Sequence, residues 1–512
     1  MLAKVWSAAV RGIEGFPVGV ELDLANGLPS FTTVGLPDSS VREARDRVVS
    51  AVRNSGFKFP SRRVTVNLAP AEWRKAGTQL DLPIGLGILI ASGQLEAAEW
   101  AGERCFLGEL ALDGGVRPVS GVLAMAAAAR AKGLRGVVLP RANGPEGALS
   151  GIGSHGVSSL REAAELVRSG RPALEEPAER VEPPEPEPER EDLADVRGQS
   201  LARRALEIAA AGGHNLLMVG PPGTGKSMLA RRLPGILPPL DPEEALEVTK
   251  VYSAAGRLRA GGGLVRRRPF RAPHTTASTP AMVGGGPQCR PGELVLAHRG
   301  VLFLDELPEF SRASLEALRQ PLEDRRVTVA RLKDTIEYPA DFTLVAAMNP
   351  CPCGYGGSRT RACRCTERAV ARYRAKISGP LLDRIDLQVE VAVVSFAQWS
   401  LRDGASPECS ASVRRRVIGA REAARARSGG KGACLNAGLS PRELRAFCVP
   451  DPETWELLES SARRRRFSPR ALDRLLRVAR TIADLEGGPA IRRRHMAEAL
   501  QYRALDRAAE EN

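Results

Sequence analysis

LLMVGPPGTGKSMLARRL, residues Leu216 to Leu233, is the most informative stretch of this 512-residue sequence. An apolar run precedes a glycine-rich turn and a helical pattern follows it, which predicts a strand, a loop and a helix. Its spacing fits G-x-x-x-x-G-K-[ST], in which backbone N–H groups cradle phosphates, the lysine reaches the outer phosphates and the hydroxyl ligates Mg²⁺. A merely tight turn would explain neither the lysine nor the serine. We therefore predict an ATP site formed by Gly220, Pro221, Pro222, Gly223, Thr224, Gly225, Lys226 and Ser227.

A second motif, GVLFLDELPEF, begins about 80 residues later. Val301 to Leu304 read as a buried parallel strand that ends in two carboxylates. Ligands of doubly wound sheets lie at strand ends, so Asp305 is predicted to hold Mg²⁺ and Glu306 to orient and deprotonate the attacking water. The alternative is that the acidic pair caps the next element.

Three further polar residues complete the predicted site. Asn349 ends a third apolar strand, FTLVAAMNP, and Arg384 lies between aspartates in GPLLDRIDL. The stretch FSPRALDRLLRVARTIADL predicts a helix with Ser468 as N-cap and Pro469 at its first position. Arg470 falls in the first turn, where the helix dipole disfavours a cation unless an anion is near, so we interpret it as a phosphate contact.

In this order the motifs resemble those of AAA+ ATPases. FRAPHTTAS, RPGELVLAHRGVLFLDELPEF, MNPCPCGYGG, ISGPLLDRIDL and ARTIADLEG look more closely like the magnesium-chelatase-like AAA+ proteins of the ComM/YifB type. The resemblance implies that Asn349 is sensor 1, that Arg384 is an arginine finger acting on a neighbouring subunit's ATP, and that Arg470 is the sensor-2 arginine. The family usually has paired histidines where this chain has His274 and Thr275, which puts any role needing both imidazoles in doubt.

Composition points to a soluble, cytoplasmic protein. The longest apolar run is far shorter than the roughly 18 residues that span a bilayer, and the N-terminus lacks a signal-peptide pattern. Nine scattered cysteines suit a reducing compartment. The formal net charge is +14, and arginine runs near the C-terminus fit a polyanionic partner or, equally, ordinary solvated helix faces.

The predicted organisation is α/β with four segments. Residues 1–168 form an α/β domain, 169–192 an acidic Pro/Glu-rich linker, 193–395 a P-loop core with a parallel sheet flanked by helices, and 396–512 a C-terminal helical lid. Strands are expected in RVTVNLAP and GVVLP, and helices in SSVREARDRVVSAV and GVLAMAAAARAKG.

The N-terminal blocks around TQLDLPIGLGILIASG and FLGELALDGGVRPVSGVLAM resemble the proteolytic domain of Lon-type proteases, which use a serine activated by a lysine. Here the serine position is Ile84, and the lysine segment, Ser120 to Met125, contains no lysine. The resemblance therefore implies the fold without the catalytic dyad; a nucleophile elsewhere, such as Ser120, is the minor alternative.

The segment RRVTVARLKDTIEYP predicts a hairpin with Arg331 and Lys333 at its tip. In related helicase-clade ATPases such hairpins project into the pore of a ring, so the resemblance implies a homo-hexamer whose basic tips grip DNA. A surface hairpin with ordinary charges is the alternative. Aromatic residues make up only 4% of the chain, so backbone contacts without sequence preference are expected.

A cysteine cluster follows Asn349: Cys351, Cys353, Cys363 and Cys365 form two C-x-C pairs. Four thiolates can close a tetrahedral zinc site, although C-x-x-C pairs are more usual. Free thiols or a redox-sensitive loop are the alternatives.

The resemblance implies a hexameric ATP-dependent DNA translocase or helicase that promotes branch migration in recombination during natural transformation. Its expected partners are single-stranded or branched DNA and further copies of itself, with no membrane partner. Three alternatives stay open at this point: a magnesium-chelatase-type motor that remodels a metal-insertion partner, an ATP-dependent Lon-like protease, and a DNA-binding regulator without motor activity.

Overall fold

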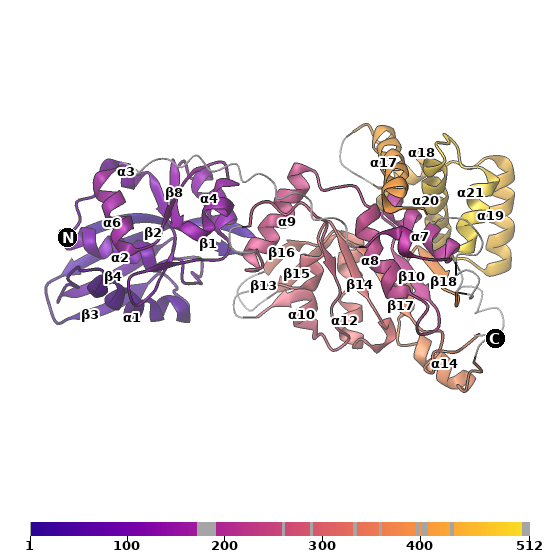
Figure 1. Ribbon diagram of the computed structural model, residues 1–512, viewed down its shortest axis with the longest axis horizontal. Helices are drawn as coiled ribbons and strands as arrows, with labels where there is room; N and C mark the ends of the chain where they lie inside the picture. The colour runs from indigo at the N-terminus through magenta and orange to yellow at the C-terminus, as the bar shows by residue number, and fades with distance from the viewer. Residues whose placement is uncertain are drawn as a thin grey trace.

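The computed structural model describes residues 2–170, 191–258, 262–286, 290–330, 335–357, 361–394, 400, 408–430 and 435–503. Figure 1 shows an elongated molecule with an N-terminal α/β unit at one end, a second α/β unit in the middle and a group of helices at the other end. This mixed content confirms the predicted α/β class. In the described part of the chain, no helix has the length and apolar character to cross a membrane.

The N-terminal sheet has seven strands in the order β3-β4-β2-β1-β5-β8-β9. The pairs β1/β2 and β2/β4 are antiparallel, and the other neighbours are parallel. β4 and β8 confirm the strands predicted in RVTVNLAP and GVVLP. The strands are β1 (Leu2–Arg11), β2 (Glu14–Ala25), β3 (Ser30–Val34), β4 (Arg63–Ala69), β5 (Arg104–Phe106), β8 (Gly136–Pro140) and β9 (Gly153–Val157), with a separate pair β6 (Glu109–Leu110) and β7 (Val116–Arg117).

The helices of this unit include the two predicted from sequence, α1 and α4. The apolar run DLPIGLGILIA forms the buried helix α2. Gly87 is required there, because a Cβ at this position would lie 2.1 Å from Leu22 Cδ1 of β2. The helices are α1 (Ser39–Asn54), α2 (Asp81–Ala91), α3 (Glu99–Gly102), α4 (Val122–Ala131), η1 (Arg141–Asn143), α5 (Gly144–Ala148) and α6 (Leu160–Ser169).

The second sheet has five parallel strands in the order β11-β14-β17-β10-β18. β10, β14 and β17 confirm the three strands predicted before the phosphate loop, Asp305 and Asn349. All three are buried along their whole length, and because they are parallel their carboxyl ends meet at one edge of the sheet. The strands are β11 (Phe270–Arg271), β14 (Val301–Leu304), β17 (Thr343–Met348), β10 (Leu216–Val219) and β18 (Leu387–Glu390).

Helices and short strands surround this sheet. The Asp241 side chain caps helix α9 by accepting from Glu244 N at 2.8 Å. The elements are η2 (Leu193–Asp195), α7 (Ser200–Gly212), α8 (Lys226–Ile236), α9 (Pro242–Ala254), α10 (Thr279–Val283), β12 (Gly284–Gly285), β13 (Arg290–Pro291), α11 (Glu293–Leu296), η3 (Leu307–Glu309), α12 (Arg312–Glu316), α13 (Arg319–Asp324), α14 (Glu367–Arg374) and α15 (Gly379–Leu382).

The C-terminal helices share a hydrophobic core with the second sheet and with α7 and α8. The predicted helix after Ser468 is α20, and Ser468 Oγ caps it by accepting from Ala471 N at 3.3 Å. The helices are α17 (Ser410–Arg427), η4 (Asn436–Gly438), α18 (Pro441–Phe447), α19 (Pro452–Arg465), α20 (Pro469–Leu485) and α21 (Arg493–Gln501).

Most of the predicted linker, residues 169–192, lies outside the described residues. The elements on either side extend into the two ends of this predicted linker. Ser169 is the last residue of α6, and the Asp192 side chain caps η2 by accepting from Ala194 N at 2.7 Å. Asp192 also accepts from Ser410 N at 3.0 Å, which ties the start of the second unit to α17.

The predicted hairpin is present as the antiparallel pair β15 (Arg326–Ala330) and β16 (Thr335–Pro339). Arg331 and Lys333, its predicted DNA-contacting tip, lie outside the described residues. Ile13, in the turn between β1 and β2, packs with Ile336 and Tyr338 in one hydrophobic cluster. Strand β16 of the hairpin therefore contacts the N-terminal unit.

A polar joint connects the two α/β units at the facing ends of α4 and α9. Gly121 N donates to Ser253 O at 3.1 Å. The buried Glu146 carboxylate accepts from Leu123 N at 2.9 Å, from Asn143 Nδ2 at 3.1 Å and from Ser253 Oγ. Ser253 belongs to the second unit, so one carboxylate links residues from both.

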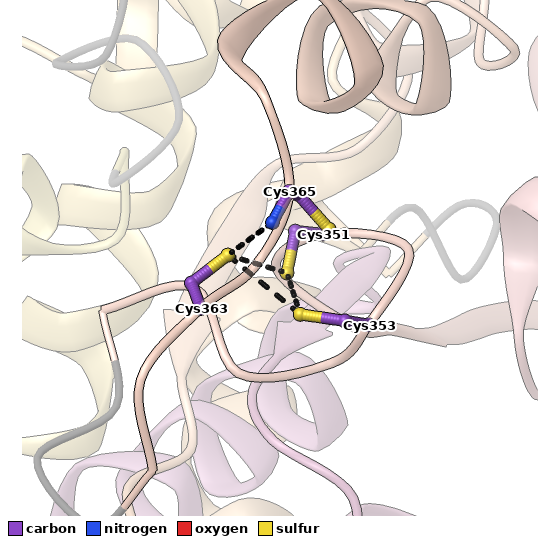
Figure 2. Close-up of side chains that lie close together, drawn as sticks. All are labelled: Cys351, Cys353, Cys363 and Cys365. Atoms are coloured by element: carbon purple, nitrogen blue, oxygen red, sulfur yellow. Dashed lines mark hydrogen bonds between the residues drawn. The ribbon is translucent and has the colours of Figure 1, made fainter.

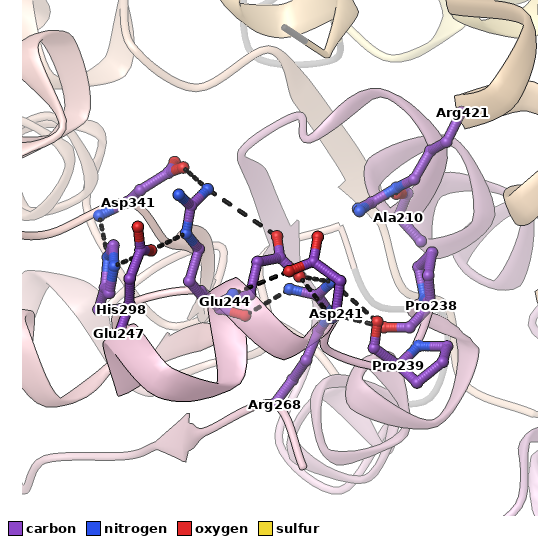
Figure 3. A network of polar contacts seen from close by, with 11 residues as sticks. Ala210, Pro238, Pro239, Asp241, Glu244, Glu247, Arg268, His298, Asp341 and Arg421 are labelled. Carbon is purple, nitrogen blue, oxygen red and sulfur yellow. Dashed lines mark hydrogen bonds and ion pairs between the residues drawn. The ribbon is translucent and has the colours of Figure 1, made fainter. Parts of the chain in front are cut away.

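The other end of α9 is fixed to the sheet by charged side chains, shown in Figure 3. Glu247 accepts from Arg299 Nε at 2.9 Å and contacts His298 Nε2 at 3.2 Å, just before β14. Arg268 donates to Glu244 at 2.8 Å and to Pro238 O at 2.6 Å. Helix α9 thus spans from the start of β14 to the N-terminal unit.

Candidate nucleotide-binding site

The phosphate loop runs from Gly220 to Gly225 between β10 and α8. Gly223 and Gly225 have φ values of 77° and 87°, a left-handed conformation that favours glycine. Gly220 is required for space, since a Cβ there would lie 2.3 Å from Val391 O, just past β18. Thr224 Oγ1 donates to Pro221 O at 2.9 Å and closes the loop. The resulting curve ends at the N-terminus of α8, whose free N–H groups attract anions.

Lys226 lies at the centre of this loop and is only 8% exposed. Its ammonium donates to Gly220 O at 2.6 Å, to Pro221 O at 2.9 Å and to Asn349 Oδ1 at 3.3 Å. Burial lowers the pKa of Lys226, while the charges of Asp305 and Glu306 act in the opposite direction.

Ser227 and Asp305 meet across the site. Ser227 Oγ donates to Asp305 Oδ2 at 2.6 Å, and Glu306 N donates to Asp305 Oδ1 at 3.0 Å. Glu306 has a φ of 52°, a left-handed conformation that is uncommon for a residue other than glycine. A hydroxyl beside a carboxylate at a strand end supplies the hard oxygen ligands that Mg²⁺ prefers.

Asn349 enters the site from β17. Its side chain reaches Lys226, and its backbone N–H hydrogen-bonds the Tyr373 hydroxyl of α14. Burial raises the pKa of Tyr373 to about 12. Gly220 N also donates to Met348 O at 3.2 Å, so β17 and the phosphate loop are held together by backbone as well as side chains.

Two arginines from the sequence prediction lie apart from this cluster. Arg384 follows α15, donates to Pro380 O at 2.8 Å and pairs with Glu323 at the end of α13. Arg470 is exposed in the first turn of α20. Among the described residues, neither arginine has a hydrogen bond to the phosphate loop.

Gln199 is a site residue that the motifs did not reveal. Its side-chain amide donates to Thr224 O at 3.3 Å and to Ala392 O at 2.6 Å, bridging the phosphate loop and the segment after β18. Its φ of 54° is left-handed. No nearby pattern signals this contact, because Gln199 and Ala392 are 193 positions apart.

The four cysteines of the predicted cluster converge, as Figure 2 shows. Their sulfur atoms all lie within 4.8 Å of one another. Cys351 is buried and the other three are partly or fully exposed. Backbone N–H groups of Arg364 and Tyr355 donate to Cys353 and, with the neighbouring Cys351 thiol, lower its pKa to about 6.

The two positions that the sequence comparison with Lon-type proteases singled out lie in or beside helices of the N-terminal unit. Ile84 is fully buried in α2, and the segment from Ser120 to Met125 leads into α4, which begins at Val122. Ser120 borders a cavity of about 200 Å³ together with Glu146 and Ser253, and neither lysine nor histidine is among the described residues that line it.

Comparison with known families gives three matches along the chain. Residues 192–399 match the model described as magnesium chelatase, subunit ChlI; residues 407–503 match its C-terminal model. Residues 20–143, where the sequence resembles Lon-type proteases, match the model described as subunit ChlI of Mg-chelatase.

Individual proteins resemble the chain over nearly its full length. The uncharacterized protein YifB of Salmonella typhimurium is 45% identical over 509 residues, covering 99% of this chain and 98% of that protein. YifB of Escherichia coli is 44% identical over 511 residues, with the same coverage. The competence protein ComM of Haemophilus influenzae is 44% identical over 528 residues, again covering 99% and 98%.

Proposed function

The chain belongs to the magnesium-chelatase-like family of the ComM/YifB type, and on that premise we propose that it is a hexameric ATPase that translocates on DNA. The observation that carries the ATPase part is the meeting of Lys226, Ser227 and Asp305 at the carboxyl ends of β10 and β14. ATP and Mg²⁺ are its proposed substrate and metal ion.

Each residue has a role that follows from its position. Lys226 exchanges its carbonyl acceptors for oxygens of the outer phosphates, which are better partners for an ammonium group. Ser227 and Asp305 are the residues that would hold Mg²⁺, which neutralises charge on the phosphates when bound. Glu306 orients and deprotonates the attacking water, and Asn349 fixes the outer phosphate from the β17 side.

The arginines support a ring in which neighbouring subunits share each ATP. Arg384 has no hydrogen bond to the phosphate loop of its own chain among the described residues, and only one carboxylate, Glu323, pairs with it there. An arginine supplied by a neighbour stabilises transition-state charge and couples hydrolysis to subunit movement. Arg470, in the first turn of α20, is proposed as the sensor that ties the C-terminal helical lid to the nucleotide.

DNA is the proposed polymer on which the motor acts. The β15/β16 hairpin is present, and its tip carries Arg331 and Lys333 in the sequence. The net charge of +14 favours a polyanion bound through its phosphates. Because one relative is named a competence protein, we extend the proposal to branch migration of recombination intermediates in natural transformation, in the cytoplasm.

A chelatase-type motor is the second candidate, favoured by the descriptions of the three matching families. It would use the same ATP site to remodel a protein that inserts a metal ion. DNA would then have no effect on hydrolysis, which separates the two candidates.

The test is the ATPase rate of the purified protein without DNA, with single-stranded DNA and with forked DNA, each at 50 and 200 mM salt. We expect several-fold stimulation that fades at the higher salt, because phosphate contacts release counterions. Lys226→Ala protein serves as the inactive control. A rate that does not respond to either DNA would refute the translocase and favour the chelatase-type motor.

A further inference from the structure

We propose that Cys351, Cys353, Cys363 and Cys365 bind one structural Zn²⁺ ion, and that the loop closed by this ion supports the phosphate loop from outside. The metal site does not depend on the proposed ATPase function. The second part rests on the proposed ATPase function, because it concerns the same nucleotide site.

The sulfur positions fit a single tetrahedral ion. Cys351 Sγ lies 3.4 Å from Cys353 Sγ and 3.6 Å from Cys363 Sγ, and the latter two are 3.6 Å apart. Four sulfurs at about 2.3 Å from a tetrahedral Zn²⁺ are separated by roughly 3.8 Å. These separations are far longer than the bond of about 2.05 Å in a disulfide. Four soft thiolates select zinc over the hard cation of the ATP site.

Backbone groups around the cluster favour thiolates. Gly356 N donates to Cys351 Sγ at 3.1 Å, and Cys365 N donates to Cys363 Sγ at 3.4 Å. Such N–H donors stabilise negatively charged sulfur, as the second shell of a metal site does.

The loop has little else to hold it in place. In the described parts of residues 352–365, the side chains are exposed or half-buried, and Gly354 is the only buried position. Without a hydrophobic core, the ordering of this segment must come from another source, and metal binding can supply folding free energy.

The cysteine-containing loop packs tightly against the phosphate loop. A Cβ on Gly354 would lie 2.8 Å from both Cγ and Cδ of Pro222. At one end of the loop Asn349 contacts Lys226, and beyond the other end Tyr373 hydrogen-bonds the backbone of Asn349. The two ends of the segment from Asn349 to Tyr373 therefore contact each other. The four cysteines lie between these ends, and Pro222 of the phosphate loop packs against the segment.

The first experiment measures metal content and nucleotide affinity on the full-length protein. Zinc is quantified by plasma mass spectrometry, and affinity is measured by titration with a fluorescent ATP analogue. We expect one zinc per chain in the wild type. The double variant Cys363→Ser/Cys365→Ser should lose the zinc and bind the nucleotide about tenfold more weakly. Cys409→Ser, an exposed cysteine outside the cluster, should leave both quantities unchanged.

The second experiment separates the contact from the metal. Gly354→Ala places a methyl group against Pro222, whereas Gly357→Ala has no atom within 4 Å of the added carbon. Both glycines have left-handed φ values, 84° and 70°, so the backbone strain is matched. We expect both variants to keep their zinc, and only Gly354→Ala to lose nucleotide affinity severalfold.

The outcomes overturn different parts of the proposal. A wild-type protein that contains no zinc, and takes up none when titrated with Zn²⁺ after reduction, excludes the metal site. A zinc-free double variant with wild-type nucleotide affinity, or equal affinities of Gly354→Ala and Gly357→Ala, excludes the supporting role. If the zinc-loaded wild type fails to bind nucleotide at all, the proposed ATPase function fails while the metal site stands.

Discussion

Removing the Glu146 side chain tests how the two α/β units are joined. The variant Glu146→Ala leaves Leu123 N, Asn143 Nδ2 and Ser253 Oγ without their shared acceptor. Glu146 is only 6% exposed. Each buried polar group that loses its hydrogen-bond partner costs about 1–3 kcal/mol of stability. Water that enters the neighbouring cavity of about 200 Å³ can hydrogen-bond to these groups and offsets part of this cost. We expect a net loss of about 3 kcal/mol in the free energy of unfolding.

The assay is calorimetry of the full-length protein. For a unit of this size, 1 kcal/mol shifts the midpoint by about 2–4 °C, so Glu146→Ala should lower the N-terminal transition by about 6–12 °C. Ser253→Ala removes only the hydroxyl supplied by the second unit and should cost about 1 kcal/mol. Glu96→Ala, at an exposed position of the same unit, is the control. If Glu146→Ala lowers the midpoint no more than the control does, Glu146 does not join the two units.

Three further predictions concern the site, the ring and pH. Ser227→Ala should lower Mg²⁺-dependent ATP hydrolysis at least tenfold, with recovery at high Mg²⁺ concentration, measured by phosphate release. Arg384→Ala should bind ATP normally but hydrolyse it at least tenfold more slowly, and added Lys226→Ala subunits should restore part of the rate by supplying Arg384 in trans. Burial raises the pKa of Asp81 from 3.8 to about 6, although its ion pair with Arg47 acts in the opposite direction. The folded protein therefore keeps the proton longer than the unfolded chain does, so stability is highest below pH 3.8 and falls as the pH rises to about 6; chemical denaturation should show this slope, and Asp81→Asn should remove it.

The sequence predicted the elements that are encoded over short distances. The phosphate loop, the strand before Asp305 and the helix after Ser468 are where their motifs placed them. Each depends on neighbours a few positions away: glycines that permit left-handed backbone, apolar runs that must be buried, and a hydroxyl that caps a helix.

The sequence also predicted the cysteines as a set, but it left zinc and free thiols as alternatives. The spacing of two C-x-C pairs cannot say whether four sulfurs meet, because the loop between them has many conformations. The folded chain decides this, since its sulfurs lie within 4.8 Å of one another.

What the sequence determined by itself is the side-chain types of the candidate nucleotide site and the strands that precede them, because short motifs fix local backbone and side-chain type. Only the tertiary structure decided that Gly354 presses on Pro222, that Gln199 bridges to Ala392, and that Glu146 reaches Ser253, 107 residues away. Contacts between distant segments depend on how sheets and helices pack as wholes, and no local pattern records that packing.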